Sequence, residues 1–248
     1  MEWIEPDWPA PTRVRAFCTT RRGGASAGPF SSMNLADHVG DDPAAVARNR
    51  AILRDRLGLP AEPHWLSQVH GCAVARTEVD ERGCEADAVL AFRSGEVCAV
   101  LTADCLPLLL CDRAGTRVGA VHAGWRGLVD GVIEAAVERL ETPPDELLCW
   151  LGPAIGPGAF EVGDEVRERF LTQGRAEAAA AFRPSDNGRW LADLFALAIG
   201  RLRALGVEQV WGGGLCTHSD GERFFSYRRD GITGRMASLI WIGPATDR

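Results

Sequence analysis

The sequence contains no lysine, and its 27 basic residues are all arginine. This absence excludes lysine Schiff-base chemistry, pyridoxal phosphate attachment and a phosphate-binding loop of the Walker type, because each needs a lysine side chain. Histidine is also scarce, with five residues at His38, His64, His70, His122 and His218. So few histidines limit how much transition metal the protein can bind.

Excess positive charge, long apolar runs and paired cysteines are missing too. The formal net charge is −7 and the pI is about 5.3, which argues against nucleic acid or an anionic membrane as a partner. No apolar run approaches the roughly 18 residues of a membrane span, and the acidic, Pro-rich start MEWIEPDWPAP does not resemble a signal peptide. The eight cysteines are spaced singly, and the chain has no N-x-S/T sequon. These features predict a cytoplasmic protein whose thiols are mostly core residues.

The pattern of apolar segments predicts an α/β protein of a single domain, residues 1–248. A chain that is 46% hydrophobic can bury a full core, and no linker is long enough to separate two domains. Strand-like runs cover Arg13–Thr19, Ala73–Val79, Val97–Leu101, Leu106–Cys111, Arg117–Val121, Leu147–Leu151, Val207–Trp211 and Ala237–Ile242. They alternate with helical patterns, but their uneven spacing argues against a βα barrel.

The clearest helix signal begins at Pro43, which suits the first helical position, after Asp41 or Asp42 as the capping residue. Gly58 is expected to end this helix. Further helices are predicted over Leu128–Leu140, Asp164–Leu171 and Leu191–Leu205.

The candidate chemistry gathers around one stretch, residues 97–127. Cys105 follows the first strand-like run of this stretch, and His122 ends the last one. His70 ends another β-favouring run, His64–Val69. Two histidines and one cysteine are the ligand count of a catalytic zinc site, which keeps its fourth position open to water or substrate. Asp104 could orient a ligand histidine or simply satisfy nearby backbone groups.

The same residues allow two other interpretations. Cys105 could be a thiolate nucleophile with His122 as its base and Asp104 or Asp87 as the orienting carboxylate, in a hydrolase of amide or peptidoglycan-precursor substrates. Alternatively, a metal could stabilise a binding module without catalysis. That interpretation is weaker, because structural zinc usually takes four protein ligands and no fourth ligand stands out.

Two glycine-rich turns predict contacts with anions. The loop Thr20–Ser26 places Arg21 beside adjacent glycines, whose backbone N–H groups can converge. The segment HAGWRG places Gly124 and Arg126 at a helix N-terminus, where N–H groups and the helix dipole favour negative charge. In each case the glycines could instead serve only a surface turn or close helix–strand packing.

Together these motifs resemble the YfiH family, whose members are also described as multicopper polyphenol oxidases or laccase-domain proteins. The resemblance runs in order along nearly the whole chain through TTRRGG, SSMNLADHVGDD, QVHG, TADCLPLLL, HAGWRG, GPAIGPGAFEV and FFSYRRD followed by TGR. It implies a single-domain layered α/β/β/α sandwich with mixed sheets and a zinc site made by His70, Cys105 and His122.

The resemblance also implies purine nucleosides and phosphate as partners. The expected reactions are phosphorolysis of adenosine, inosine or methylthioadenosine to base and sugar 1-phosphate, and deamination of adenosine. Cys105, Asp104 and Arg126 are then the catalytic candidates. The candidates for contacts with substrate or phosphate are Arg21, Asn34, Gly124, Arg126, Tyr227 and Arg228. A monomer or a weak homodimer is expected.

The oxidase label of the family conflicts with the histidine count. A blue-copper site plus a trinuclear copper cluster needs more histidine ligands than this chain has. Copper could replace zinc adventitiously at the His/His/Cys site, so polyphenol oxidation is expected only as a side activity. An open zinc site suits deamination better, because zinc lowers the pKa of water to about 7. The H-x-E and P-C-x-x-C elements of cytidine-type deaminases are absent, so that site would follow another plan.

Overall fold

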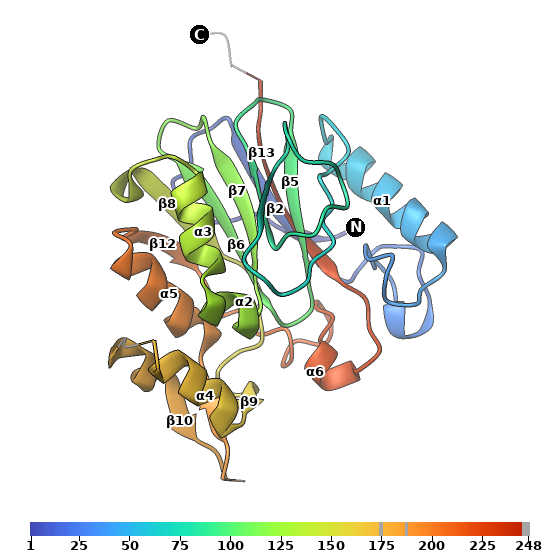
Figure 1. The fold of residues 1–248 in the computed structure, drawn as a ribbon. Coiled ribbons are helices and arrows are strands. Elements are labelled where there is room, and N and C mark those ends of the chain that lie inside the picture. The colour runs from blue at the N-terminus through green and yellow to red at the C-terminus, as the bar shows by residue number, and fades with distance from the viewer. Residues whose placement is uncertain (174–175, 187, 245–248) are drawn as a thin grey trace.

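Two large β-sheets lie face to face in the centre of the molecule, with helices on both outer faces (Figure 1). The computed structural model describes residues 1–173, 176–186 and 188–244. The larger sheet has six strands in the order β12 (Gln209–Gly212), β8 (Leu147–Leu151), β6 (Leu106–Asp112), β7 (Val118–Ala123), β4 (Ala88–Ala91) and β3 (Val74–Arg76). Its β12–β8 and β3–β4 pairs are parallel and its other pairs antiparallel, so the sheet is mixed, as predicted.

The second large sheet is antiparallel throughout. Its four strands are β1 (Trp3–Ile4), β2 (Val14–Thr19), β13 (Met236–Ile242) and β5 (Val97–Thr102), in that order. A third, small sheet consists of β10 (Phe182–Pro184), β11 (Trp190–Ala192) and β9 (Glu161–Val162).

Five central strands, β5, β6, β7, β8 and β13, are buried along their whole length because both of their faces are covered. In β6, Leu108 and Leu110 belong to the core under the helices, whereas Leu109 and Cys111 belong to the core between the two large sheets. Every residue of this strand is buried. The layering therefore explains why the sequence shows continuous apolar runs rather than strict alternation.

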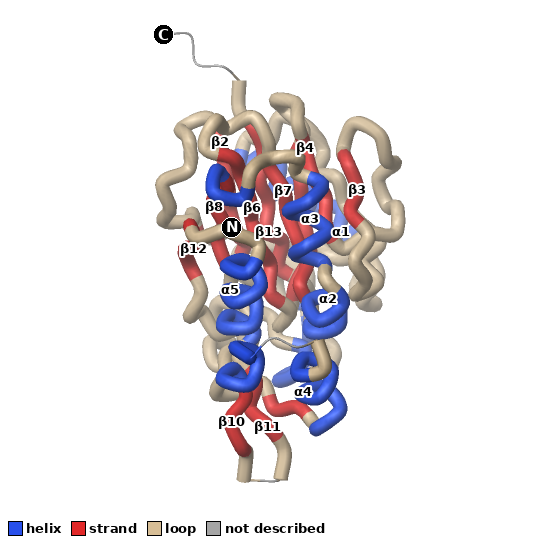
Figure 2. Tube along the Cα trace, turned by 60° about the vertical axis from the view of Figure 1, so that its left-hand side comes forward, coloured by secondary structure: helices blue, strands red, loops and turns tan. Residues whose placement is uncertain are grey.

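Helix α1 (Pro43–Leu57) covers the four-stranded sheet, and Leu53 shares a core with Phe17 and Trp241 of that sheet. Helices α2 (Trp125–Asp130), α3 (Val132–Arg139) and α5 (Leu194–Ala204) cover the six-stranded sheet (Figure 2). Helix α4 (Asp164–Leu171) packs beside the small sheet, and the short α6 (Tyr227–Asp230) precedes β13. This is the α/β/β/α arrangement that the resemblance to the YfiH family implies.

The predicted start and end of α1 are confirmed in detail. The side chain of Asp42 accepts a hydrogen bond from the N–H of Ala44 at 2.9 Å, and Pro43 opens the helix. Gly58 ends it in the left-handed conformation with φ of 58°. Such a conformation favours glycine, which lacks the Cβ that would clash.

Three predicted elements are corrected. The helix expected over Leu128–Leu140 is broken at Gly131, whose φ of 104° ends α2 and begins α3. The expected helix Leu191–Leu205 begins only at Leu194, because residues 190–192 pair as β11 and Asp193 caps α5. The run His64–Val69 makes only isolated bridges, since His64 pairs with Cys98 of β5 whereas Ser67 pairs with Glu85, which lies outside the strands.

All eight cysteines are free thiols. Among the described residues, no helix has both the length and the apolar character needed to cross a membrane.

Candidate metal centre

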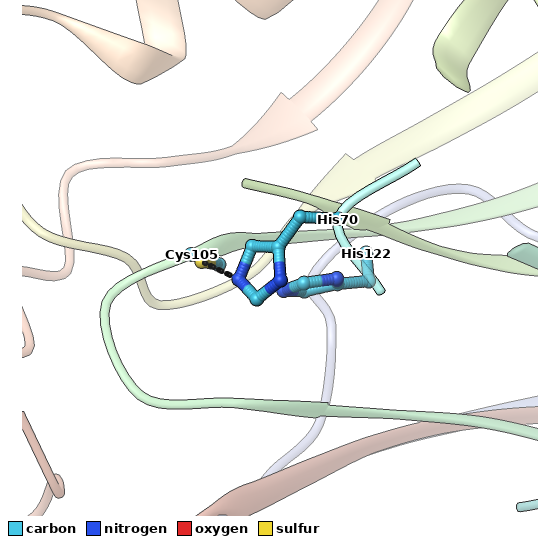
Figure 3. Close-up of side chains that lie close together, drawn as sticks. All are labelled: His70, Cys105 and His122. Carbon is cyan, nitrogen blue, oxygen red and sulfur yellow. Dashed lines mark hydrogen bonds between the residues drawn. The ribbon is translucent and has the colours of Figure 1, made fainter. Parts of the chain in front are cut away.

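His70, Cys105 and His122 meet at one point, although they come from three separate parts of the chain (Figure 3). His122 lies in β7, Cys105 lies in the turn between β5 and β6, and His70 lies in the loop before β3. One ligand atom from each residue lies within 4.8 Å of the others, and the Cys105 Sγ is 3.8 Å from the His70 Nε2. The prediction that these three residues converge is confirmed.

The separation between the Cys105 sulfur and the His70 Nε2 is close to that expected around a tetrahedral metal ion. Zn–S bonds of about 2.3 Å and Zn–N bonds of about 2.0 Å place sulfur and nitrogen roughly 3.6 Å apart, close to the observed separation. The Nδ1 of His122 is engaged with Asp87, so its Nε2 is the nitrogen that a metal can use. Within the described ranges this is the one group of three metal-ligating side chains. The soft sulfur and the imidazoles suit zinc, and they suit copper as well.

The buried carboxylate of Asp87 holds two of the three ligands. Its Oδ1 accepts hydrogen bonds from the Nδ1 of His122 at 2.8 Å and from the backbone N–H of His70 at 2.9 Å. Its Oδ2 accepts from the backbone N–H groups of Val69 and Gly71. Burial raises the pKa of Asp87, but the hydrogen bonds and the charge of His122 outweigh burial and lower it. Asp87 therefore sets both the tautomer of His122 and the path of the His70 loop.

The backbone is strained on both sides of the centre. His70 has a φ of 61° and Asp104 a φ of 90°, and left-handed conformations are uncommon for residues other than glycine. Hydrogen bonds compensate: Gln68 donates to the carbonyl of Leu101 and accepts from its N–H, which ties the His70 loop to the end of β5. The strained loops are thereby held in place around the ligands.

Gly124 serves the centre through its lack of a side chain. A Cβ at this position would lie 2.8 Å from the Cδ2 of His70 and 3.0 Å from the Sγ of Cys105. Gly124 caps α2, which has only six residues. We therefore attribute the role of Gly124 to the space it leaves for two ligands rather than to an anion at the helix end.

Cys105 and His122 shift each other's pKa in opposite directions. Burial raises the pKa of the Cys105 thiol, but the charge and hydrogen bond of His122, helped by His70, lower it to about 6. Burial lowers the pKa of His122, but Cys105 and Asp87 raise it to about 9. The pair thus favours a thiolate beside a charged or metal-bound imidazole near neutral pH.

Asp104 was expected to be catalytic, to orient a ligand histidine or to satisfy nearby backbone groups, and its carboxylate does bind a backbone N–H. Its Oδ1 accepts a hydrogen bond from the Oγ1 of Thr217 at 2.6 Å. Its Oδ2 accepts from the Oγ of Ser226 at 3.0 Å and from the backbone N–H of Arg228 at 2.6 Å. The carboxylate behind His122 is Asp87 instead, and Asp104 anchors the start of α6 beside Cys105.

The metal ligands line a cavity of about 540 Å³, within the usual range of small-molecule sites. Its wall also carries three arginines, Arg126, Arg228 and Arg235. The remaining lining residues are His38, Gln68, Leu101, Thr102, Ala103, Asp104, Trp125, Ile155, Phe160 and Tyr227. The structure therefore brings Arg126, Tyr227 and Arg228 to the candidate site, as expected from the sequence.

Arg21 and Asn34 were also expected to contact substrate or phosphate, but neither lines the cavity. The guanidinium of Arg21 donates to the carbonyls of Ser31 and Gly221 and lies over the ring of Phe225. The side chain of Asn34 is fully buried and bonds to the backbone on both sides, including the N–H of Arg235. Both side chains hold loops together, and this structural role explains why they lie in the motifs without any contact to substrate or phosphate.

Several cavity residues escaped the sequence analysis. Arg235 ends the TGR motif, and His38 and Gln68 lie within other quoted motifs. The sequence therefore marks these residues, but it does not show that their side chains line the cavity. Trp125 and Phe160 also lie within quoted motifs, HAGWRG and GPAIGPGAFEV, but their apolar side chains gave no sign of a role. Only the fold shows that these side chains face the metal ligands.

Residues 15–243 match the family described as multi-copper polyphenol oxidoreductase laccase. The chain belongs to this family. It is 57% identical over 241 residues to a purine nucleoside phosphorylase of Pseudomonas aeruginosa, which covers 97% of this chain and 98% of that protein. It is 50% identical over 240 residues to the purine nucleoside phosphorylase YfiH of Escherichia coli K12, covering 96% and 98%. The expected resemblance to YfiH is thereby confirmed.

Solved structures show the same fold. The crystal structure of protein NMB0706 of Neisseria meningitidis matches with a TM-score of 0.94 and 48% identity, covering 98% of this chain and all of that one. YlmD of Geobacillus stearothermophilus matches with a TM-score of 0.93 and 30% identity, covering 98% and 97%.

Replacing Asp87 should weaken metal binding. An Asp87→Asn variant loses a carboxylate oxygen that accepts backbone N–H groups and the charge behind His122, so we expect about 10- to 100-fold lower affinity for zinc. Asp112→Asn is a matched control, because Asp112 is also buried and accepts the N–H groups of Thr116 and Arg117, but outside the cavity. Competition with a chromophoric chelator measures both affinities. Equal affinities in the two variants would contradict the role of Asp87.

Adding one methyl group at Gly124 should also impair the centre. Gly124→Ala places a Cβ against two ligands, and we expect loss of at least half of the bound metal in purified protein. Gly158→Ala is the control, since a Cβ there meets nothing within 4 Å. Metal analysis and thermal melting of both variants test this prediction, and a fully loaded Gly124→Ala protein would refute it.

The lowered pKa of Cys105 predicts selective alkylation after the metal is removed with a chelator. Because the thiolate persists at any pH above about 6, iodoacetamide should label Cys105 half-maximally near that pH. Cys18 and Cys111 should stay unlabelled in the folded protein, since burial raises the pKa of each thiol to about 12. Mass spectrometry across pH 5 to 9, with and without added zinc, locates the label. A midpoint near the ordinary value of 9 would contradict the thiolate.

Proposed function

We propose that this protein is a zinc-dependent purine nucleoside phosphorylase that uses inorganic phosphate. The observation that carries the proposal is the composition of one cavity, in which a His/Cys/His metal group faces three arginines and several aromatic side chains. The relatives from Pseudomonas aeruginosa and Escherichia coli, both named purine nucleoside phosphorylases, support it.

In the proposed reaction an oxygen of phosphate forms a bond to C1′ of the sugar while the bond from C1′ to the purine breaks. The base leaves with the bonding electron pair and takes up a proton. The chain's part is to place phosphate and nucleoside against each other and to balance negative charge, which arginine does well because its planar cation binds oxyanions in pairs of hydrogen bonds.

The cavity residues divide this work between them. Arg126 and Arg228 carry fixed positive charge at its wall, and Tyr227, with 61% of its surface exposed, offers a ring on which a purine can stack. Ile155 and Phe160 are buried apolar residues that limit the access of water. Asp87 binds the Nδ1 of His122 and so leaves its Nε2 available to a metal.

His70, Cys105 and His122 would hold zinc, which in an open three-ligand site supplies Lewis-acid polarisation and lowers the pKa of water. That chemistry favours adenosine deamination as a second activity of the same cavity, and we include it in the proposal. Copper at this donor set would account for weak polyphenol oxidation. A multicopper mechanism needs further histidine clusters, and the described residues contain this one group.

One observation favours a second candidate. Cys105, His122 and Asp87 supply the three residue types of a cysteine hydrolase, with the carboxylate 2.8 Å from the imidazole and a thiol of lowered pKa. In that case the thiolate itself attacks the substrate, and metal would inhibit the enzyme.

A single set of assays separates these functions. Wild type, Cys105→Ala and the control Cys84→Ala, which changes a partly exposed cysteine outside the cavity, are analysed for zinc and assayed on adenosine with and without phosphate. We expect about one zinc per chain in wild type and control, phosphate-dependent release of adenine and ribose 1-phosphate, and loss of zinc and activity in Cys105→Ala. Inosine formation without phosphate reports deamination.

Two results would overturn the phosphorylase proposal. One is adenine release that does not depend on phosphate. The other is metal-free wild type that remains active until Cys105 is alkylated, which would favour the cysteine hydrolase.

A further inference from the structure

The three arginines of the cavity differ in their surroundings. Arg126 is exposed and lies over the ring of Trp125, 4.5 Å from its centroid. Arg228 is exposed as well, and its Nη1 donates to the carbonyl of Glu161. Arg235 is half-buried, directly before β13. It is the arginine whose charge is shielded from water.

Arg235 is held firmly by groups that carry no charge. Its backbone N–H donates to the Oδ1 of the fully buried Asn34 at 2.9 Å. Its Nη1 donates to the carbonyls of Thr233 at 2.9 Å and Gly234 at 3.0 Å. These contacts fix both the backbone and one nitrogen of the guanidinium, so the side chain is pre-organised.

No carboxylate among the described residues forms an ion pair with Arg235. The acid whose charge acts on it is Asp104, but both oxygens of Asp104 are already engaged by Thr217, Ser226 and the N–H of Arg228. Burial accordingly lowers the pKa of Arg235, against the opposing charges of Cys105, Asp104 and Tyr227. A shielded cation without a paired anion is costly, and an anionic ligand would remove that cost.

The guanidinium still has donors to offer. Its Nε and Nη2 donate to no described residue, and together they form the edge of the guanidinium that binds two oxygens of one oxyanion. Arg235 lines the same cavity as His70, Cys105 and His122. A dianion bound by this edge would share the cavity with a cation held by the metal ligands.

We propose that Arg235 is the principal phosphate-binding residue of the cavity, with Arg126 and Arg228 as weaker, solvent-exposed contributors. This inference rests on the proposed phosphorylase function and specifies which side chain recognises the phosphate. It also explains why Asn34 is buried behind the cavity, because Asn34 holds the backbone of Arg235.

The test separates the two substrates kinetically. In zinc-loaded Arg235→Met protein we expect the KM for phosphate to rise by about 10- to 100-fold, the loss expected for charge-assisted hydrogen bonds, while the KM for adenosine changes less than about threefold. Arg235→Lys, which keeps the charge but not the paired donors, should lie in between. Arg117→Met is the matched control, since Arg117 is also half-buried but lies over Phe92 outside the cavity.

Calorimetric titration of inorganic phosphate into the zinc-loaded proteins without nucleoside gives an independent measurement. Weaker phosphate binding by Arg235→Met and Arg235→Lys, but not by Arg117→Met, would support the inference even if wild type proved inactive on nucleosides. An active wild type together with an unchanged phosphate KM and affinity in both Arg235 variants would overturn it and leave the phosphorylase function intact. Equal increases in both KM values would also overturn it.

Discussion

The candidate site depends on one buried carboxylate. Asp87 joins β7, through His122, to the loop that carries His70, and it does so with hydrogen bonds to one imidazole and three backbone N–H groups. A buried charge without such partners would be strongly destabilising. Since all of these donors converge on Asp87, the same bonds that stabilise the charge also determine where two metal ligands lie.

A second buried carboxylate organises the opposite side of the cavity. Asp104 follows β5 and binds Thr217, Ser226 and the N–H of Arg228, so it ties α6 to the turn that presents Cys105. These hydrogen bonds connect the turn that carries Cys105 to α6, whose residues Tyr227 and Arg228 line the cavity. They accompany the left-handed backbone at Asp104, whereas the left-handed backbone at His70 is held by Asp87 and by the Gln68–Leu101 bonds.

The chemistry of the cavity agrees better with the phosphorylase relatives than with the laccase description of the family. The described residues offer one group of three metal ligands, whereas multicopper oxidation needs several copper sites. The absence of lysine leaves anion recognition to arginine, whose charge persists at every physiological pH. Three arginines beside one metal group suit a reaction that combines phosphate with a neutral nucleoside.

The sequence by itself predicted most strands of the two large sheets, the caps of α1 and the convergence of His70, Cys105 and His122. These follow from local patterns: apolar runs, Asp-Pro and Gly at helix ends, and metal-ligating residue types at strand ends. Only the tertiary structure decided which carboxylate supports His122, that Arg235 faces the cavity, and that Arg21 and Asn34 do not. Asp87 and Asp104 look alike in sequence, each lying beside a strand. Their roles differ because contacts between residues far apart in the chain depend on how the two sheets pack, and no local pattern encodes that packing.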